Sequence, residues 1–383
     1  MLREMRLIAV LVAAMATLVL AIDVAAAEPA WKPLAHVAGV LDVSAPRTDG
    51  KLVVAGAGKL YLMDLSGKVT ALANGEDKGA EPYLAVSPGL AGTGCSFAPD
   101  DLFILRLHAP IGVTRIAAGG ARSNFASLPL AALGGIAFDT TGAFGHRLLV
   151  AGNTKAGERE LIALDCAGHQ FVINGALPAN EGGFAVAPSS FGAFAGMVIA
   201  PDELSGKIWA FGGNGTVQLL VDSGLPHGGD VGVESAGFVP PGFLRGGTAF
   251  LADRLTPGGA HPGSDSVLTL SSADLATAGV QEGDLLVATE GGAQTIDVRC
   301  TDSCTVKTVI GTATKAHAEG HLIFVTTAPP PSPSPSASPA VSPSPQPAPS
   351  GGLSPVVLAA LVLGVGVAAA TVLVVVLEVR RPR

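Results

Sequence analysis

Hydrophobic and polar residues alternate along most of the chain between Leu34 and Thr326, in short runs separated by turns that contain Gly, Pro or Ser. Alternation over a few residues indicates a half-buried β-strand, and the region lacks long segments with a helical period. The pattern therefore predicts an all-β domain built from many short antiparallel strands.

These strands recur in a repeating unit. Segments 134–152 and 182–201 resemble one another closely, and segments 83–100 and 236–253 match them more loosely. Each contains a strand, a Gly/Pro/Ser turn and a second strand. Further hairpins are predicted in segments 60–73, 102–117, 161–175, 208–222 and 295–311.

The repeat has a period of about 50 residues with four short strands per unit, which is typical of a β-propeller. A single four-stranded unit cannot bury both of its faces, whereas radial stacking buries them. About six such blades fit between Leu34 and Thr326. Segment 271–283 interrupts the pattern, so five or seven blades remain open alternatives.

The repeated strand–turn–strand pattern resembles a known group of propellers over most of the domain. Segments 58–69 (GKLYLMDLSGKV) and 206–217 (GKIWAFGGNGTV) are examples. The strand–turn–strand texture resembles six-bladed propellers of the NHL and SMP-30 (gluconolactonase-like) type. This resemblance implies a propeller with a central channel, and in its lactonase members a divalent metal bound in that channel.

The N-terminus predicts export. Arg3 and Arg6 precede an apolar run over residues 7–22, and three alanines at 25–27 form a small-residue cleavage site before Glu28. This pattern is that of a secretory signal peptide. An uncleaved signal anchor is the alternative, which the shortness of the apolar run disfavours.

The C-terminus predicts a membrane anchor. Residues 356–377 are uncharged and long enough to cross a hydrocarbon core of about 30 Å, and Arg380, Arg381 and Arg383 follow them. Because basic residues favour the cytoplasmic side, we expect a single-pass cell-membrane protein with its C-terminus inside and its main domain outside.

The expected organisation is therefore a signal peptide (1–27), an extracellular β-propeller (28–327), a Pro/Ser/Ala-rich spacer (328–353), a transmembrane helix (354–379) and a basic cytoplasmic tail (380–383). The spacer favours an extended polyproline path, which suits a domain held away from the bilayer across a cell-wall layer.

Charge and cysteine content narrow the classes of function. The net charge is −8 and the Lys and Arg residues form no cluster outside the C-terminal tail, which argues against nucleic-acid binding. Cys300 and Cys304 flank a turn between two alternating segments, so we predict a disulfide across that hairpin. The pairing of Cys95 and Cys166 stays open, as bonded partners or free thiols.

Carboxylates recur just before the predicted first strand of three blades. Glu81, Glu181 and Glu234 hold these positions, whereas the third blade has Leu133. Acidic side chains gathered around a channel can bind Ca²⁺ or another divalent cation through oxygen atoms. Solvated turn acids explain the same pattern, and we favour that interpretation.

The lactonase resemblance singles out one group of residues for the metal. Glu181 matches the family's channel glutamate best, and Asn180, Asp230 and Glu234 are its expected companions. A metal-dependent hydrolase would therefore use Glu81, Glu181, Asp230 and Glu234.

Two histidine-containing segments are weaker candidates. His227 lies on a Gly-rich connection and is a candidate general base at the channel mouth. His317 and His321 bracket Glu319, but that spacing suits a metal pair on a helix, and the following residues predict a strand. The signal for a metal-binding pair there is therefore weak.

Taken together, the sequence favours a surface-anchored propeller that binds an extracellular or cell-wall ligand or acts as a scaffold. The alternative function is a divalent-metal-dependent hydrolase of the lactonase type, with its site in the channel.

The predicted topology can be tested on intact cells. A protease-sensitive tag inserted at Ser350 should be cleaved from outside, because the spacer is expected to be extracellular, and a tag after Arg383 should be protected. The reverse pattern would overturn the orientation.

Overall fold

The computed structural model of the protein describes residues 28–76, 81–92, 94–178 and 182–327. The predicted signal peptide, spacer, transmembrane helix and cytoplasmic tail lie outside these residues and stay predictions. Within the described part, no helix is both long and apolar enough to cross a membrane.

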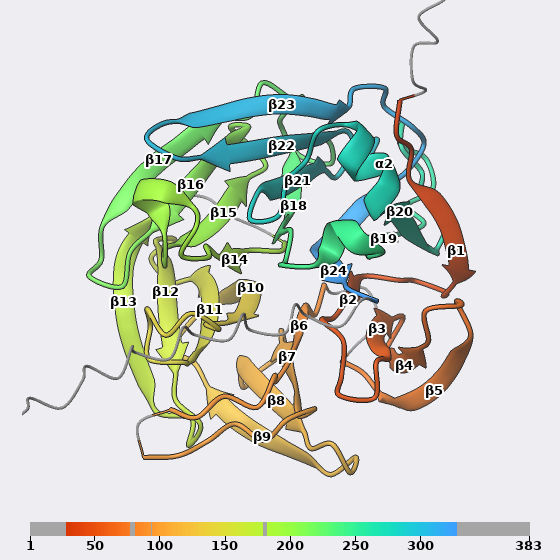
Figure 1. The fold of residues 1–383 in the computed structure, drawn as a ribbon. Helices are drawn as coiled ribbons and strands as arrows, with labels where there is room; N and C mark the ends of the chain where they lie inside the picture. Colours follow the sequence, from red (N-terminus) through yellow and green to blue (C-terminus); the bar gives the residue numbers. More distant parts are fainter. Residues whose placement is uncertain (1–27, 77–80, 93, 179–181, 328–383) are drawn as a thin grey trace, which may run out of the picture. The chain divides into compact units, whose positions relative to one another are not determined.

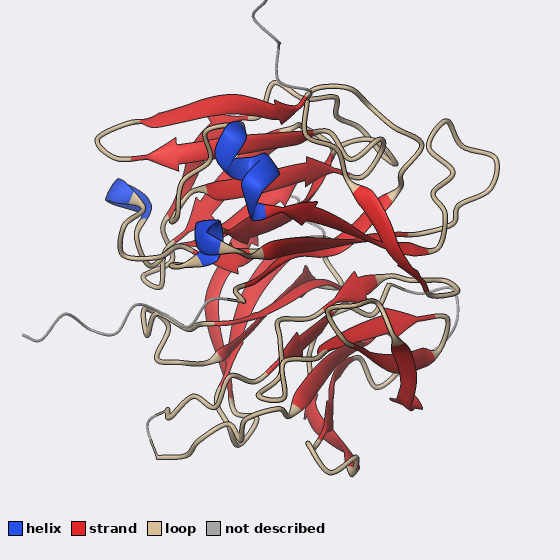
Figure 2. Cartoon of the chain, turned by 45° about the vertical axis from the view of Figure 1, so that its right-hand side comes forward, coloured by secondary structure: helices blue, strands red, loops and turns tan. Residues whose placement is uncertain are grey.

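The described strands form six four-stranded antiparallel sheets arranged around a centre (Figure 1). The sheets are the blades of a β-propeller, so the predicted fold is confirmed and the blade number is six. In Figure 1, strands β2, β6, β10, β14, β18 and β24 lie nearest the centre, and the last strand of each blade lies on the rim. Strands and loops dominate the turned view as well, with only short helices (Figure 2).

The first four blades each use four consecutive strands. Blade 1 contains β2 (Asp42–Val43), β3 (Leu52–Gly56), β4 (Lys59–Met63) and β5 (Val69–Asn74). Blade 2 contains β6 (Leu84–Val86), β7 (Leu102–Arg106), β8 (Gly112–Ile116) and β9 (Arg122–Ser127). Blade 3 contains β10 (Ala132–Phe138), β11 (Leu148–Asn153), β12 (Arg159–Leu164) and β13 (Gln170–Leu177). Blade 4 contains β14 (Ala185–Val186), β15 (Val198–Asp202), β16 (Lys207–Phe211) and β17 (Val217–Asp222).

The last two blades exchange strands along the chain. Blade 5 contains β18 (Val233–Phe238), β21 (Leu285–Thr289), β22 (Thr295–Cys300) and β23 (Cys304–Ile310). Blade 6 contains β24 (Ala318–Val325), β19 (Thr248–Asp253), β20 (Ser266–Ser271) and, on the rim, β1 (Lys32–His36). The chain thus leaves blade 5 after one strand, builds the middle of blade 6, and returns. The N-terminal strand completes the last blade and closes the ring.

This exchange corrects one sequence-based prediction. Segment 236–253 was expected to form a hairpin within one blade, but β18 pairs with β21 and β19 pairs with β20 and β24. The strands have the right alternation, but local pattern does not reveal which sheet a strand joins.

The segment that interrupts the repeat holds helix α2 (Ser272–Thr277). Its N-cap residue is Ser271, whose side chain accepts a hydrogen bond from the Asp274 backbone N–H.

A second correction concerns blade 2. Segment 102–117 was expected to supply its third and fourth strands, but it forms β7 and β8, the second and third strands, and β9 is the fourth. The hairpins predicted in segments 60–73, 161–175, 208–222 and 295–311 are the last two strands of their blades.

The hydrophobic core lies between neighbouring blades. Between blades 2 and 3, for example, Phe97, Phe103 and Phe138 stack edge to face with ring centroids 5.0 to 5.5 Å apart. Such aromatic pairs favour offset or perpendicular geometry. Because the second strands are covered on both faces, β3 and β21 are buried at every position.

Both disulfides lie at blade edges. The structure pairs Cys300 with Cys304 across the β22–β23 turn, where the sequence predicted a bridge. It also pairs Cys95 with Cys166, which the sequence had left open. This second bond joins the β6–β7 connection of blade 2 to the β12–β13 turn of blade 3.

A buried ion pair connects the inner strands. The Asp42 carboxylate, which is fully buried, accepts hydrogen bonds of 2.8 Å from the backbone N–H groups of Val43, Leu84 and His321. It also lies 2.9 Å from His321 Nδ1, and His321 Nε2 lies 2.8 Å from the Ile136 carbonyl oxygen. Residues of blades 1, 2, 3 and 6 are thereby joined in one network.

Replacing Asp42 by Asn tests the importance of this network. The amide NH₂ would face groups that are donors themselves, and the His321 ring would lose its counter-ion. We expect a loss of about 3–5 kcal/mol in the free energy of unfolding, measured by chemical denaturation. Asp302→Asn, at an exposed turn, is the matched control. An equal effect of the two substitutions would contradict this role.

Candidate functional site

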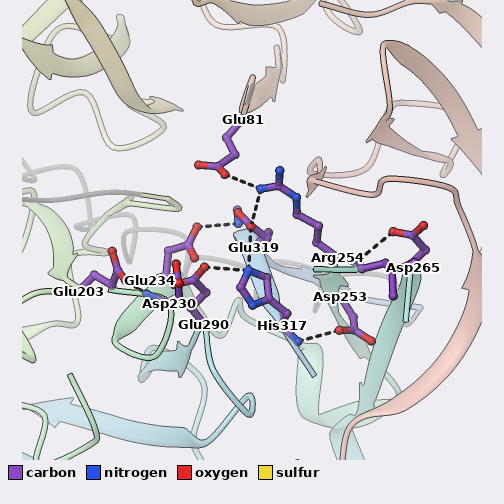
Figure 3. Close-up of polar contacts among 12 residues, drawn as sticks. Glu81, Glu203, Asp230, Glu234, Asp253, Arg254, Asp265, Glu290, His317 and Glu319 are labelled. Carbon is purple, nitrogen blue, oxygen red and sulfur yellow. Dashed lines mark hydrogen bonds and ion pairs between the residues drawn. The ribbon is translucent and has the colours of Figure 1, made fainter. Parts of the chain in front are cut away.

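One end of the central channel carries a concentration of ionisable side chains. They come from the starts of inner strands and from the ends of the second strands, which meet at the same end because neighbouring strands are antiparallel. We call this group the charged cluster; its members are Glu81, Glu234, Arg254, Glu290, His317 and Glu319 (Figure 3).

Arg254 bridges two blades within the charged cluster. It follows β19, and its Nη1 atom contacts Glu81 Oε1 from the loop before β6 and lies 3.0 Å from Glu319 Oε1 on β24. Its backbone N–H donates to the His317 carbonyl oxygen at 2.8 Å. The guanidinium therefore neutralises carboxylates from blades 2 and 6.

His317 lies between two carboxylates. Its Nε2 atom is 2.9 Å from Glu290 Oε1 and 3.4 Å from Glu319 Oε1. Burial by itself would lower the pKa of His317, but the contacts with Glu290 and Glu319 outweigh burial and raise the pKa to about 10. At neutral pH the imidazole therefore carries a positive charge in this arrangement.

Glu234 is a buried acid of the charged cluster, 3% exposed. Its Oε1 accepts hydrogen bonds from the Tyr83 hydroxyl at 2.9 Å and from the Gly320 backbone at 3.2 Å. Burial, followed by the nearby charges of Glu319 and Glu290, raises the pKa of Glu234 well above its usual range. These surroundings favour the neutral acid.

Two glycines allow this close packing. Gly182 and Gly320 both have positive φ, at 73° and 69°, a region that glycine adopts at little cost. A Cβ on Gly182 would lie 2.4 Å from Glu234 Cγ, and one on Gly320 would lie 2.4 Å from Asp42 Oδ1. A larger residue at either position would displace the carboxylate.

The structure brings together some of the residues that the sequence singled out. Glu81 and Glu234 both belong to the charged cluster, on opposite sides of the Arg254–Glu319 contact (Figure 3). Asp230 lies nearby on the loop before β18, where its backbone N–H donates to Glu203 Oε1 at 2.7 Å.

Other predicted site residues lie elsewhere. Glu181 and Asn180 are outside the described residues, so their roles stay predictions. His227 is solvent-exposed and packs beside Gly206, away from the polar contacts of the charged cluster. His227 therefore has no partner in the charged cluster that would support its predicted role as a general base.

The interpretation of His317 and His321 needs correction. Their spacing was judged meaningful only on a helix, but residues two apart on a strand point to the same face. His317, just before β24, and Glu319 and His321 on that strand therefore all face the channel. Period-two spacing on a first strand was the signal that could have identified them.

Sequence reasoning also missed Arg254 and Glu290. Each follows the second strand of a blade, after β19 and β21 respectively. Because these strands belong to the two blades that exchange segments, only the tertiary arrangement places both residues beside β24.

Among the described residues, Glu290, His317 and Glu319 form a group that is compact enough to hold a metal ion. Their candidate ligand atoms all lie within 4.8 Å of one another. Two carboxylates and an imidazole suit a transition metal better than Ca²⁺, which takes oxygen ligands. Three protein ligands would leave a coordination position open, as in catalytic zinc sites, but His317 would first have to lose its proton.

The opposite end of the channel is apolar. The ends of inner strands β6, β10, β14, β18 and β24, together with residues that follow β2, surround a cavity of about 310 Å³. All six blades contribute to its wall. We call this cavity the apolar well. His321, held by Asp42, lies between the well and the charged cluster.

Comparisons with known proteins give only distant structural similarities. No protein-family model and no curated protein matches the sequence. Among solved structures, the chain is similar to a streptogramin B lyase, with 11% identity over 76% of this chain and 91% of the other and a TM-score of 0.41. Virginiamycin B lyase from Staphylococcus aureus gives 12% identity, 76% and 92% coverage and a TM-score of 0.40.

A gluconolactonase from Xanthomonas campestris is also similar, with 13% identity over 59% of this chain and 70% of the other and a TM-score of 0.38. The predicted six-bladed propeller fold is shown by the six described sheets themselves, and gluconolactonases are among the structures to which the chain is similar. At these identities the activities of the similar proteins do not transfer to this chain.

The charged cluster predicts a stability that falls as pH rises. When the folded state raises the pKa of an acid above its unfolded value, here 4.5, it binds the proton more tightly than the unfolded state. Stability from Glu234 is then present at low pH and lost as pH rises toward the folded pKa. His317 adds a loss in the same direction at higher pH, above 6.5 and through about 10.

We expect Glu234→Gln to flatten the fall in unfolding free energy as the pH rises above 4.5, because the amide keeps an acceptor for Tyr83 and never ionises. Chemical denaturation at several pH values measures this. The exposed Glu158→Gln variant should keep the wild-type pH dependence. If Glu234→Gln kept it too, the assignment of Glu234 as a buried neutral acid would be wrong.

Proposed function

We propose that this protein is an exported, membrane-anchored binding module whose ligand site is the central channel of its propeller. The observation that carries the proposal is the apolar well, because strand ends from all six blades converge on one cavity of about 310 Å³. Ligand sites are typically concave, mostly apolar and about 300–1,000 Å³ in volume.

The state of the charged cluster favours binding over catalysis. Glu290, His317 and Glu319 have exposed fractions of only 8%, 4% and 2%. Each is engaged with a neighbouring charge, so none is presented to a substrate as a free acid, base or nucleophile. The charges of this cluster are therefore balanced by one another.

Export and anchoring complete the proposal. The predicted signal peptide and transmembrane helix would place the propeller outside the cell at the end of the Pro/Ser/Ala-rich spacer. A rigid propeller on a semi-rigid tether suits the capture of an extracellular ligand near the membrane.

A second candidate function rests on the compact group of Glu290, His317 and Glu319. If a divalent cation displaced the His317 proton, these residues would hold it, and the cation would supply Lewis-acid activation for hydrolysis of an ester or lactone. The burial of the group weighs against this function, because a substrate would need a path to the metal.

Purified full-length protein distinguishes the two functions. We expect no metal-dependent hydrolysis of a panel of short lactones, including glucono-δ-lactone, above the rate in buffer. Elemental analysis should find no stoichiometric divalent cation. Hydrolysis that required a divalent cation and was lost in Glu290→Gln, but kept in the exposed Glu158→Gln variant, would replace the binding proposal with the hydrolase.

A further inference from the structure

The wall of the apolar well is made of apolar side chains from different blades. Phe138, Phe184, Phe238 and Phe324 come from blades 3, 4, 5 and 6 and all line the cavity. These rings border one space on several sides, and Phe138 and Phe184 are 9% and 3% exposed. A molecule that covers the accessible apolar surface gains about 25 cal/mol for each Å² buried.

The well offers few partners for a polar or charged ligand. Among the described residues that line it, His321 has the only ionisable side chain. Both nitrogens of that ring are already engaged, Nδ1 with Asp42 and Nε2 with the Ile136 carbonyl oxygen. A charged ligand would lose its hydration without a counter-ion, which is strongly unfavourable.

The rim of the well is also poor in hydrogen-bond donors. Pro46, Pro88 and Pro240 line it in three different blades, each shortly after the inner strand. Proline has no backbone N–H. The turns of the sequence repeat therefore place proline residues, which lack a backbone N–H donor, around the opening.

From this chemistry we infer that the apolar well binds a compact, uncharged, lipophilic molecule with an alkyl chain or a single aromatic ring. The inference rests on the proposed binding function and specifies its ligand class. The volume of about 310 Å³ lies at the lower end of the range for ligand sites, so a longer chain would project from the opening.

The described part of the chain ends close to this end of the channel. Strand β24, whose last residues line the well, ends at Val325, and Thr327 donates a hydrogen bond to the Gly246 carbonyl oxygen in the loop that also holds Pro240. A lipophilic molecule could reach the well from solution or as the chain of a membrane lipid, and the test separates these two sources.

The test uses the full-length chain in lipid vesicles and photoreactive diazirine probes, followed by peptide mapping. An uncharged hexyl probe added from water should label peptides that contain β6, β10 or β24. A hexyl probe of equal length that ends in a carboxylate should label them less by roughly tenfold or more. Labelling of the same peptides by a hexadecyl probe held in the bilayer would assign a lipid source, and labelling by the hexyl probe alone would assign a free molecule.

Two variants test the location. Val186 lines the well on β14, and Val186→Trp should fill the cavity and reduce labelling of these peptides by roughly tenfold, because the space is small. Val172, on β13 at the edge of blade 3, is 59% exposed, so Val172→Trp is the matched control and should label like the wild type. Ala185→Leu, a smaller change in the same wall, should give an intermediate loss if Val186→Trp does not fold.

Three results would each overturn the inference: equal labelling by the charged probe, undiminished labelling in the folded well variants, or no labelling of the well by any probe. These outcomes differ from a failure of the binding function itself, which would appear as metal-dependent lactone hydrolysis. An empty labelling result without hydrolysis would overturn the lipophilic ligand class and leave the channel as the proposed site for a ligand of another class.

Discussion

The contact between Asp42 and His321 is the constraint on which the centre of this propeller depends. Because Nε2 faces a carbonyl oxygen and Nδ1 faces a carboxylate, both ring nitrogens must donate, and the ring is an imidazolium ion. Burial lowers the pKa of His321, but the Asp42 charge outweighs burial and raises it. A buried charge pair is tolerated only when its remaining hydrogen-bonding groups are satisfied, as the backbone N–H donors to Asp42 satisfy them here.

This pair also divides the channel into two chemically different halves. On one side, positive Arg254 and His317 balance a set of carboxylates, and burial raises the pKa of Glu234. On the other side, strand ends expose aromatic and aliphatic side chains to a cavity. In the first half, the polar groups contact one another. The second half is available to a ligand. The proposed function and the proposed ligand class both follow from this division.

The sequence contained more of the charged cluster than its motifs suggested. Glu81 and Glu234 were found because they lie before or at the start of first strands, a position that repeats along the chain. His317 and Glu319 were set aside because a helical spacing rule was applied to a strand, although alternate residues on a strand share a face. The local sequence does not identify Arg254 and Glu290 as site residues, because the strands before them have the same pattern as other second strands.

The sequence by itself determined the strands, their turns, the approximate length of a blade and the propeller class, since alternation and turn residues act over a few neighbouring positions. Only the tertiary structure decided the blade number, the exchange of β19 and β20 into blade 6, the Cys95–Cys166 pairing and the partners of each buried charge. These features depend on contacts between residues far apart in the chain, such as Asp42 and His321, separated by 279 positions. Side-chain alternation is the same in every sheet, so it cannot specify which sheet a strand will join.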